Sequence, residues 1–269
     1  MLTLLTALLI AQGHVHEAGD AATASGTYSA AMAAQPHPLD PGAPKPKGSM
    51  TELKIGDQTS KAYVARPKGK PQGALLVIHE YWGLNDWVKD KADQLAAQGY
   101  LALAIDLYKG EVATDPKQAA QLMQAKDEKW GDQVEAAGLE WLKKNAQGAN
   151  VAIIGWCMGG GEALKASLNE PDNVDATIIH YGMPVLDVAR LKVLHGPVLG
   201  IWANKDRSIT PEKVAQFDQA LTEAGVKHEF HAYDADHAFA NPSGGRYNGE
   251  AAKDAWDKTL KFLAANLRK

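Results

Sequence analysis

The chain has 269 residues, of which 45% are hydrophobic and 22% are charged, and this composition excludes collagen-like, coiled-coil and wholly disordered proteins. The 28 basic and 32 acidic residues give a net charge of −4, so we expect no binding to nucleic acid, which requires an excess of positive charge. A single cysteine, Cys157, excludes an internal disulfide framework and a thiolate-rich zinc site.

The first 49 residues differ in composition from the rest of the chain. Residues 2–11 form an apolar run that is too short to span a bilayer but has the length of a signal-peptide core. We therefore predict a signal peptide over residues 1–13, export to the periplasm or the cell exterior, and no stable membrane insertion after its removal. Because no basic residue precedes the run, a cytoplasmic location is the alternative. Residues 14–49 are rich in Ala, Ser, Gly and Pro and predict a flexible tether before a domain at 50–269.

Within that domain, strand patterns alternate with helix patterns. Short apolar runs predict strands at 62–65, 74–78, 101–105, 151–154, 176–181, 198–202 and 228–233. Amphipathic patterns predict helices at 86–98, 115–127, 133–145, 161–168, 211–224 and 250–267. This alternation is typical of an α/β fold with a mostly parallel central sheet and helices on both faces. Functional sites of such sheets lie at the carboxyl ends of the strands.

The most informative segment runs from the strand at 151–154 through Gly155-Trp-Cys-Met-Gly159 into a helix. This is the spacing of a nucleophile elbow, with Cys157 in the position of the nucleophile. Glycine two residues before and after the nucleophile leaves room for the sharp turn, and the following helix stabilises negative charge on sulfur. The backbone amide of Met158 can donate to an oxyanion. The alternative is a buried structural cysteine beside a glycine-rich helix start.

An elbow of this kind requires an acid after a later strand and a histidine after a still later one. Asp206 follows the strand at 198–202, and His237 follows the strand at 228–233. His237 would exchange a proton with the thiol and Asp206 would orient the imidazole. Asp206 could instead cap the next helix, and Asp234 or Asp236 could take its place beside the histidine.

Further motifs extend the pattern. His79-Glu80-Tyr-Trp-Gly-Leu-Asn85 follows the strand at 74–78, Asp106-Leu-Tyr108 follows the strand at 101–105, and the segment from Asp236 reads D-H-A-F-A-N-P. Together with the elbow, these motifs resemble the dienelactone hydrolase family of α/β-hydrolases over residues 50–267.

The resemblance implies an α/β-hydrolase fold and a triad of Cys157, His237 and Asp206. It implies that Glu80 contacts the resting thiol and takes up its proton when substrate binds, and that the backbone N–H groups of Tyr81 and Met158 form the oxyanion hole. From the residues alone, Glu80 could equally be a structural ion-pair partner.

The sequence departs from the family at the substrate end. Where dienelactone hydrolases have an arginine that holds the substrate carboxylate, this chain has Asn241, and Arg246 lies five residues further on. Either Arg246 replaces that arginine, or the substrate is a neutral lactone or small ester. Other candidates for the substrate pocket are Trp82, Trp156 and Trp202, for which core packing is the alternative.

We therefore predict a hydrolase that cleaves a small lactone or carboxylic ester through a thioester on Cys157. A general carboxylesterase or thioesterase of the same fold and a non-catalytic exported binding protein are the alternatives. No nucleotide-binding fingerprint occurs and the nine histidines form no metal-ligand motif, so we expect no cofactor and no metal. The sequence makes no prediction of oligomeric state.

Overall fold

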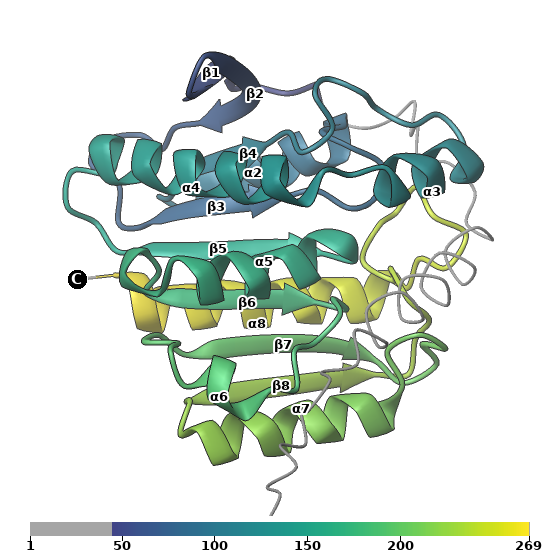
Figure 1. Cartoon of the computed structure of the whole chain (residues 1–269). Coiled ribbons are helices and arrows are strands. Elements are labelled where there is room, and N and C mark those ends of the chain that lie inside the picture. The colour runs from purple at the N-terminus through teal and green to yellow at the C-terminus, as the bar shows by residue number, and fades with distance from the viewer. Residues whose placement is uncertain (1–44, 269) are drawn as a thin grey trace, which may run out of the picture.

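Figure 1 shows the computed structural model of the chain, which describes residues 45–268. The predicted signal peptide at 1–13 and most of the predicted tether at 14–49 lie outside the described residues.

In the described part of the chain, eight strands form one sheet with the order β1-β2-β4-β3-β5-β6-β7-β8. They are β1 (Ser49–Ile55), β2 (Gln58–Ala65), β3 (Ala74–Ile78), β4 (Leu101–Ile105), β5 (Val151–Trp156), β6 (Ala176–His180), β7 (Val198–Ala203) and β8 (His228–Tyr233). Strands β3 to β8 run parallel to one another, whereas β1 and β2 form an antiparallel edge. The predicted mostly parallel sheet is confirmed.

The helices are α2 (Asp86–Ala97), α3 (Pro116–Gln124), α4 (Glu128–Asn145), α5 (Met158–Asn169), α6 (Val188–Leu191), α7 (Pro211–Ala224) and α8 (Gly249–Leu267), with a short 3-10 turn η1 (Pro171–Asn173). Helices α4 and α5 cover one face of the sheet, and α8 lies behind it in Figure 1. The rings of Trp87 in α2 and Trp256 in α8 contact Trp156 of β5, so these two helices share the second face. Among residues 45–268, no helix is both long enough and apolar enough to cross a bilayer.

The central strands are continuously apolar because both of their faces are covered. All five residues of β3 and of β4 are buried, as expected for interior parallel strands. Because these strands are apolar and buried, polar side chains gather in the loops that follow them. The loops after β3, β5, β6, β7 and β8 all start at the carboxyl end of the sheet, and these loops carry the predicted site residues.

Several elements differ in extent from the sequence prediction, and two of the differences have clear local physical reasons. Strand β1 was not predicted, since only two of its seven residues are buried and its apolar pattern is weak. Helix α5 begins at Met158 and not at residue 161, because the sharp turn at Cys157 leads directly into the first helical turn. The sequence pattern places the start of this helix at residue 161, after the first glycines that follow Cys157.

Candidate active site

Cys157 lies between β5 and α5 in a strained backbone conformation. Its φ is 58° and its ψ is −119°, a combination that is uncommon for a residue with a side chain. A Cβ on Gly155 would lie 1.9 Å from the carbonyl oxygen of Gly159, and a Cβ on Gly159 would lie 2.4 Å from the carbonyl oxygens of Ile78 and His79. Only glycine fits at either position, so the two glycines permit the turn that presents Cys157 at the carboxyl end of the sheet.

His237 and Asp206 meet at the same end of the sheet. His237 Nδ1 lies 2.5 Å from Asp206 Oδ2, and each residue is only 5% exposed. The other oxygen of Asp206 accepts hydrogen bonds from the backbone N–H groups of Ser208 (2.8 Å) and Ile209 (3.0 Å). The carboxylate is therefore held by its own loop and fixes the orientation of the imidazole.

The competing roles suggested for the acidic residues are resolved by their contacts. Helix α7 is capped by Thr210, whose hydroxyl accepts from the amide of Lys213, and not by Asp206. Asp234 is exposed and pairs with Lys205 at 3.1 Å, while Asp236 is also exposed. Of the three acids that the sequence offered, the structure places Asp206 beside the imidazole.

Cys157 and His237 contact each other, and a negative charge on Cys157 stabilises the imidazolium form of His237. Burial disfavours the imidazolium, but the negative charge of a Cys157 thiolate, the hydrogen bonds that the ring donates to Asp206 and to Cys157, and the charge of Asp206 raise the pKa of His237 to about 10. Burial also raises the pKa of Asp206, but the contacts with His237 outweigh that effect and lower it overall. Asp206, His237 and Cys157 therefore form one buried cluster in which His237 interacts with both of the other side chains.

Glu80 reaches this cluster from the loop after β3. The imidazole of His79 accepts from the amide of Leu107 at Nε2 (3.2 Å), so its Nδ1 carries the proton and donates to the carbonyl of Glu80 (2.5 Å). The Glu80 carboxyl is 3% exposed, and its Oε2 accepts a hydrogen bond from Asn241 Nδ2 at 2.7 Å. Burial raises the pKa of Glu80 to about 7, against the lowering effects of Asn241 and His237.

The residues predicted to supply oxyanion N–H groups flank the nucleophile. Met158 is the first residue of α5, where the backbone N–H groups have no acceptor within the helix. The Tyr108 hydroxyl donates to the Met158 sulfur at 3.0 Å, which ties the start of α5 to the loop after β4. Tyr81 is buried directly after Glu80, and burial together with the charges of Cys157 and Glu80 raises the pKa of its phenol.

The three tryptophans named as pocket candidates are buried in aromatic contacts. Trp156 stacks on His180 with ring centroids 5.1 Å apart, and Trp202 contacts Phe217 and Phe230. Trp82 packs edge-on against Tyr81 at 4.7 Å. These placements favour a packing role for Trp156 and Trp202, whereas Trp82 is next to a candidate oxyanion residue. Asn241 is also buried, and it contacts Glu80 instead of facing outward for a substrate.

Sequence reasoning missed two residues of the site. Tyr181 follows β6 with a φ of 38°, and its ring lies edge-on to His237 with centroids 5.3 Å apart. Lys91 of α2 is half-buried, with its ammonium 4.8 Å from the centroid of the Trp256 ring, and its charge acts on Glu80. No motif identifies either residue, because each reaches the site through packing between distant segments.

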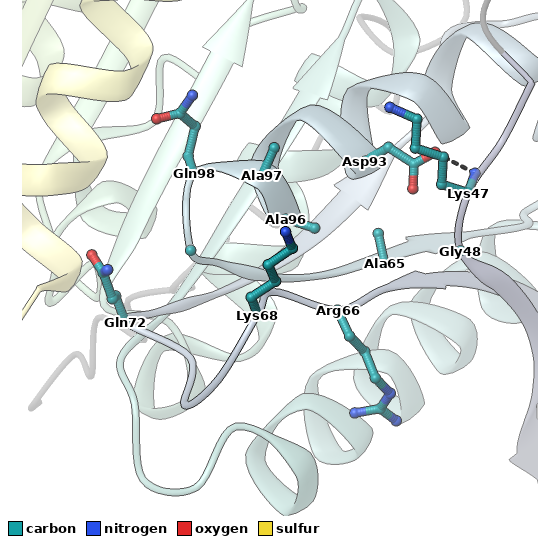
Figure 2. A pocket seen from close by; sticks show the side chains of 11 residues that line it. Lys47, Gly48, Ala65, Arg66, Lys68, Gln72, Asp93, Ala96, Ala97 and Gln98 are labelled. Atoms are coloured by element: carbon teal, nitrogen blue, oxygen red, sulfur yellow. Dashed lines mark hydrogen bonds between the residues drawn. The ribbon is translucent and has the colours of Figure 1, made fainter.

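Other charged regions lie away from this cluster. A hollow of about 570 Å³ is lined by Gln72 and Gly99, which precede β3 and β4, so it lies at the opposite end of the strands from Cys157. Figure 2 shows the Lys68 and Arg66 side chains of this hollow pointing in different directions, so they do not converge on a common ligand position. Among residues 45–268, no group of three or more His, Cys, Asp or Glu side chains is arranged to hold a metal ion.

Comparisons with known proteins agree with this architecture. The profile of the Dienelactone hydrolase family matches residues 60–267. A "Putative carboxymethylenebutenolidase" of Saccharolobus solfataricus is 32% identical over 244 residues, covering 76% of this chain and 93% of the relative. A protein of the same name from Aquifex aeolicus is 31% identical and covers 82% of this chain and all of the relative.

Solved structures give the same result. The crystal structure of a "Putative Dienelactone Hydrolase" from Klebsiella pneumoniae is 30% identical in sequence, has a TM-score of 0.69, and covers 80% of this chain and 98% of that one. The dienelactone hydrolase of Anabaena variabilis shares the fold, with a TM-score of 0.66 at 19% identity over 84% of this chain and all of that one. The chain therefore belongs to the dienelactone hydrolase family and has the α/β-hydrolase fold.

Proposed function

We propose that this protein hydrolyses a small lactone or carboxylic ester with Cys157 as the nucleophile and His237 and Asp206 as its partners. The observation that carries the proposal is the hydrogen-bonded chain from Asp206 through His237 to a cysteine held in a strained turn. A merely structural cysteine would need neither the strain nor the paired imidazole.

The reaction follows from the positions of these groups. The Cys157 thiolate attacks the carbonyl carbon, and the resulting oxyanion is stabilised by the N–H groups of Tyr81 and Met158. As the tetrahedral intermediate collapses, the C–O bond breaks and the imidazolium of His237 gives its proton to the leaving oxygen. Water then transfers a proton to His237 and attacks the thioester, releasing the carboxylic acid and regenerating the thiolate.

Glu80 would hold the proton of the resting thiol in this scheme. A carboxyl group whose pKa is raised to about 7 by burial can accept that proton at neutral pH and release it later. Because Glu80 is not in the hydrogen-bonded line from Asp206 to Cys157, it can change its charge without disturbing the orientation of His237.

The substrate is proposed to be small, since Cys157 is only 1% exposed. Arg246 is half-buried in the loop that follows His237, and its charge acts on the phenol of Tyr81. A carboxylate on the substrate could therefore pair with Arg246 next to the candidate oxyanion hole. A panel of lactones with and without a carboxylate, aryl esters and thioesters would separate a lactonase from a general carboxylesterase or thioesterase.

Alkylation tests the nucleophile directly, because the chain has one cysteine. We expect that one iodoacetamide adduct, measured by intact mass, abolishes hydrolysis of a small activated ester. A Cys157→Ser variant is the matched control, since its hydroxyl does not react with iodoacetamide and its low residual activity should survive the treatment. Full activity of the alkylated wild-type protein would exclude the proposed role of Cys157.

A further inference from the structure

The Asn241 side chain is held at both of its polar atoms. Its Oδ1 accepts a hydrogen bond from the backbone N–H of Ser243 at 3.0 Å, and its Nδ2 donates to Glu80 Oε2 at 2.7 Å. A backbone N–H can only donate, so the oxygen of the amide must face Ser243 and the NH₂ group must face Glu80. The orientation of the amide is therefore fixed, and the residue is only 3% exposed.

This contact divides the Glu80 carboxyl into a held oxygen and an open oxygen. Oε2 is held by Asn241, whereas Oε1 is fully buried and is not bound by Asn241; the phenol of Tyr181 also hydrogen-bonds to the carboxyl group. A proton bound to Oε1 would leave the hydrogen bond from Asn241 to Oε2 intact, so Glu80 can gain and lose a proton without moving.

Charged and titratable groups surround Glu80 from several elements. His237 comes from the loop after β8, Lys91 from α2, and Tyr181 from the end of β6, and each of these groups acts on Glu80. The charges of Cys157 and Glu80 both raise the pKa of the Tyr81 phenol, so the thiol and the carboxyl lie near the same side chain. The two side chains that hydrogen-bond to the Glu80 carboxyl, the Asn241 amide and the Tyr181 phenol, are nevertheless uncharged.

We propose that Asn241 is a positioning residue that fixes the Glu80 carboxyl beside the thiol–imidazole pair with an uncharged donor, so that Glu80 stays able to exchange a proton with Cys157. The inference deepens the proposed function and rests on it. The exchange moves one proton from the Cys157 sulfur to Glu80 Oε1, and it converts a thiol and a carboxylate into a thiolate and a carboxylic acid. A cationic partner in place of Asn241 would hold the carboxylate in its charged form and oppose this transfer.

The pKa of Glu80 is shifted upward, as this arrangement requires. Burial raises it to about 7, and the hydrogen bond from Asn241 lowers it by less than burial raises it. The carboxyl therefore titrates nearer to neutral pH than an exposed glutamate does, so a change in its surroundings can alter its charge there.

The substitution Asn241→Asp tests the proposal with almost no change in shape. One oxygen of the new carboxylate can still accept from Ser243, but the other faces Glu80 Oε2 across the distance that the hydrogen bond now spans. Two carboxylates this close repel each other, so the pair binds one shared proton. The pKa for the loss of that proton is higher than the pKa of Glu80 in the wild-type protein. The rate constant for alkylation of Cys157 by iodoacetamide, measured from pH 5 to pH 9, reports this change without requiring turnover.

We expect the wild-type profile to have an inflection near neutral pH that Glu80→Gln removes. In Asn241→Asp the inflection should move upward by about one pH unit or more. The matched control is Asn248→Asp, which adds the same charge at the N-cap of α8, where aspartate is equally acceptable, and should leave the profile unchanged.

If Asn241→Asp folds poorly, Asn241→Ala removes the donor to Oε2 and should shift the inflection in the same direction. A profile for a folded Asn241 variant that superimposes on the wild-type profile would overturn the inference. An alkylated protein that still hydrolyses esters would instead refute the nucleophilic role of Cys157. The alkylation profile is measured independently of that result, so the two failures can be told apart.

Discussion

Asp206→Asn is the substitution that tests the proposed triad most directly, because it changes one contact and preserves the others. The Asn oxygen can still accept from the amides of Ser208 and Ile209, which hold the loop after β7. The NH₂ group then replaces Oδ2, which lies 2.5 Å from His237 Nδ1. Since NH₂ cannot accept a hydrogen bond, Nδ1 must become the acceptor and the imidazole proton moves to Nε2.

The expected loss of activity follows from that reversed tautomer. With a proton on Nε2 the neutral imidazole cannot take a proton from the hydrolytic water that attacks the thioester. The loss of the Asp206 charge also removes part of the interaction that raises the pKa of His237 to about 10, so the thiolate–imidazolium pair becomes less stable. We expect kcat to fall roughly 10³- to 10⁴-fold, which corresponds to about 4 to 5.5 kcal/mol of transition-state stabilisation.

The assay is steady-state hydrolysis of an activated ester, with thermal unfolding of the same samples. Asp234→Asn is the matched control, because this exposed acid lies in the same loop as His237 and pairs with Lys205. It should keep kcat within about twofold of wild type, as expected for the loss of a surface ion pair. A kcat for Asp206→Asn within about tenfold of wild type, in a protein that unfolds at a similar temperature, would refute the role of Asp206.

Two further predictions concern stability. Gly159→Ala should lower the free energy of unfolding by about 3 kcal/mol or more, since its Cβ would lie 2.4 Å from two backbone oxygens, whereas Gly131→Ala in α4 should be neutral or stabilising. Equal urea midpoints for these two variants would contradict the account of the elbow. Glu80→Gln should gain stability relative to wild type as the pH rises. The folded pKa of Glu80 is raised from 4.5 to about 7, so ionisation costs wild type about 3 kcal/mol of stability between those pH values. Unfolding by urea at pH 5 and pH 8 checks this, and a difference between the two proteins that does not change with pH would count against the buried carboxyl.

The sequence was most reliable where structure depends on neighbouring residues. The strands at 74–78, 101–105 and 228–233 and the helix at 211–224 were predicted with the bounds that the structure has. The two inner strands and the helix have a clear apolar pattern and a turn or a cap at their ends, whereas 228–233 was predicted although none of its residues is fully buried. Strand β1 was not predicted because a half-exposed edge strand is stabilised by pairing with β2 and not by its own pattern. Export through residues 1–13 stays a prediction.

The sequence by itself determined the turn around Cys157, because the two glycines that permit it lie within two residues of the sulfur and the steric requirement is local. Only the tertiary structure decided which acid meets His237 and which residue holds Glu80. Asp206 and His237 are 31 residues apart, and Asn241 and Glu80 are 161 residues apart. These pairs form because the order of strands in the sheet brings their loops to one end, and no local pattern encodes a distance that depends on how the whole sheet is assembled.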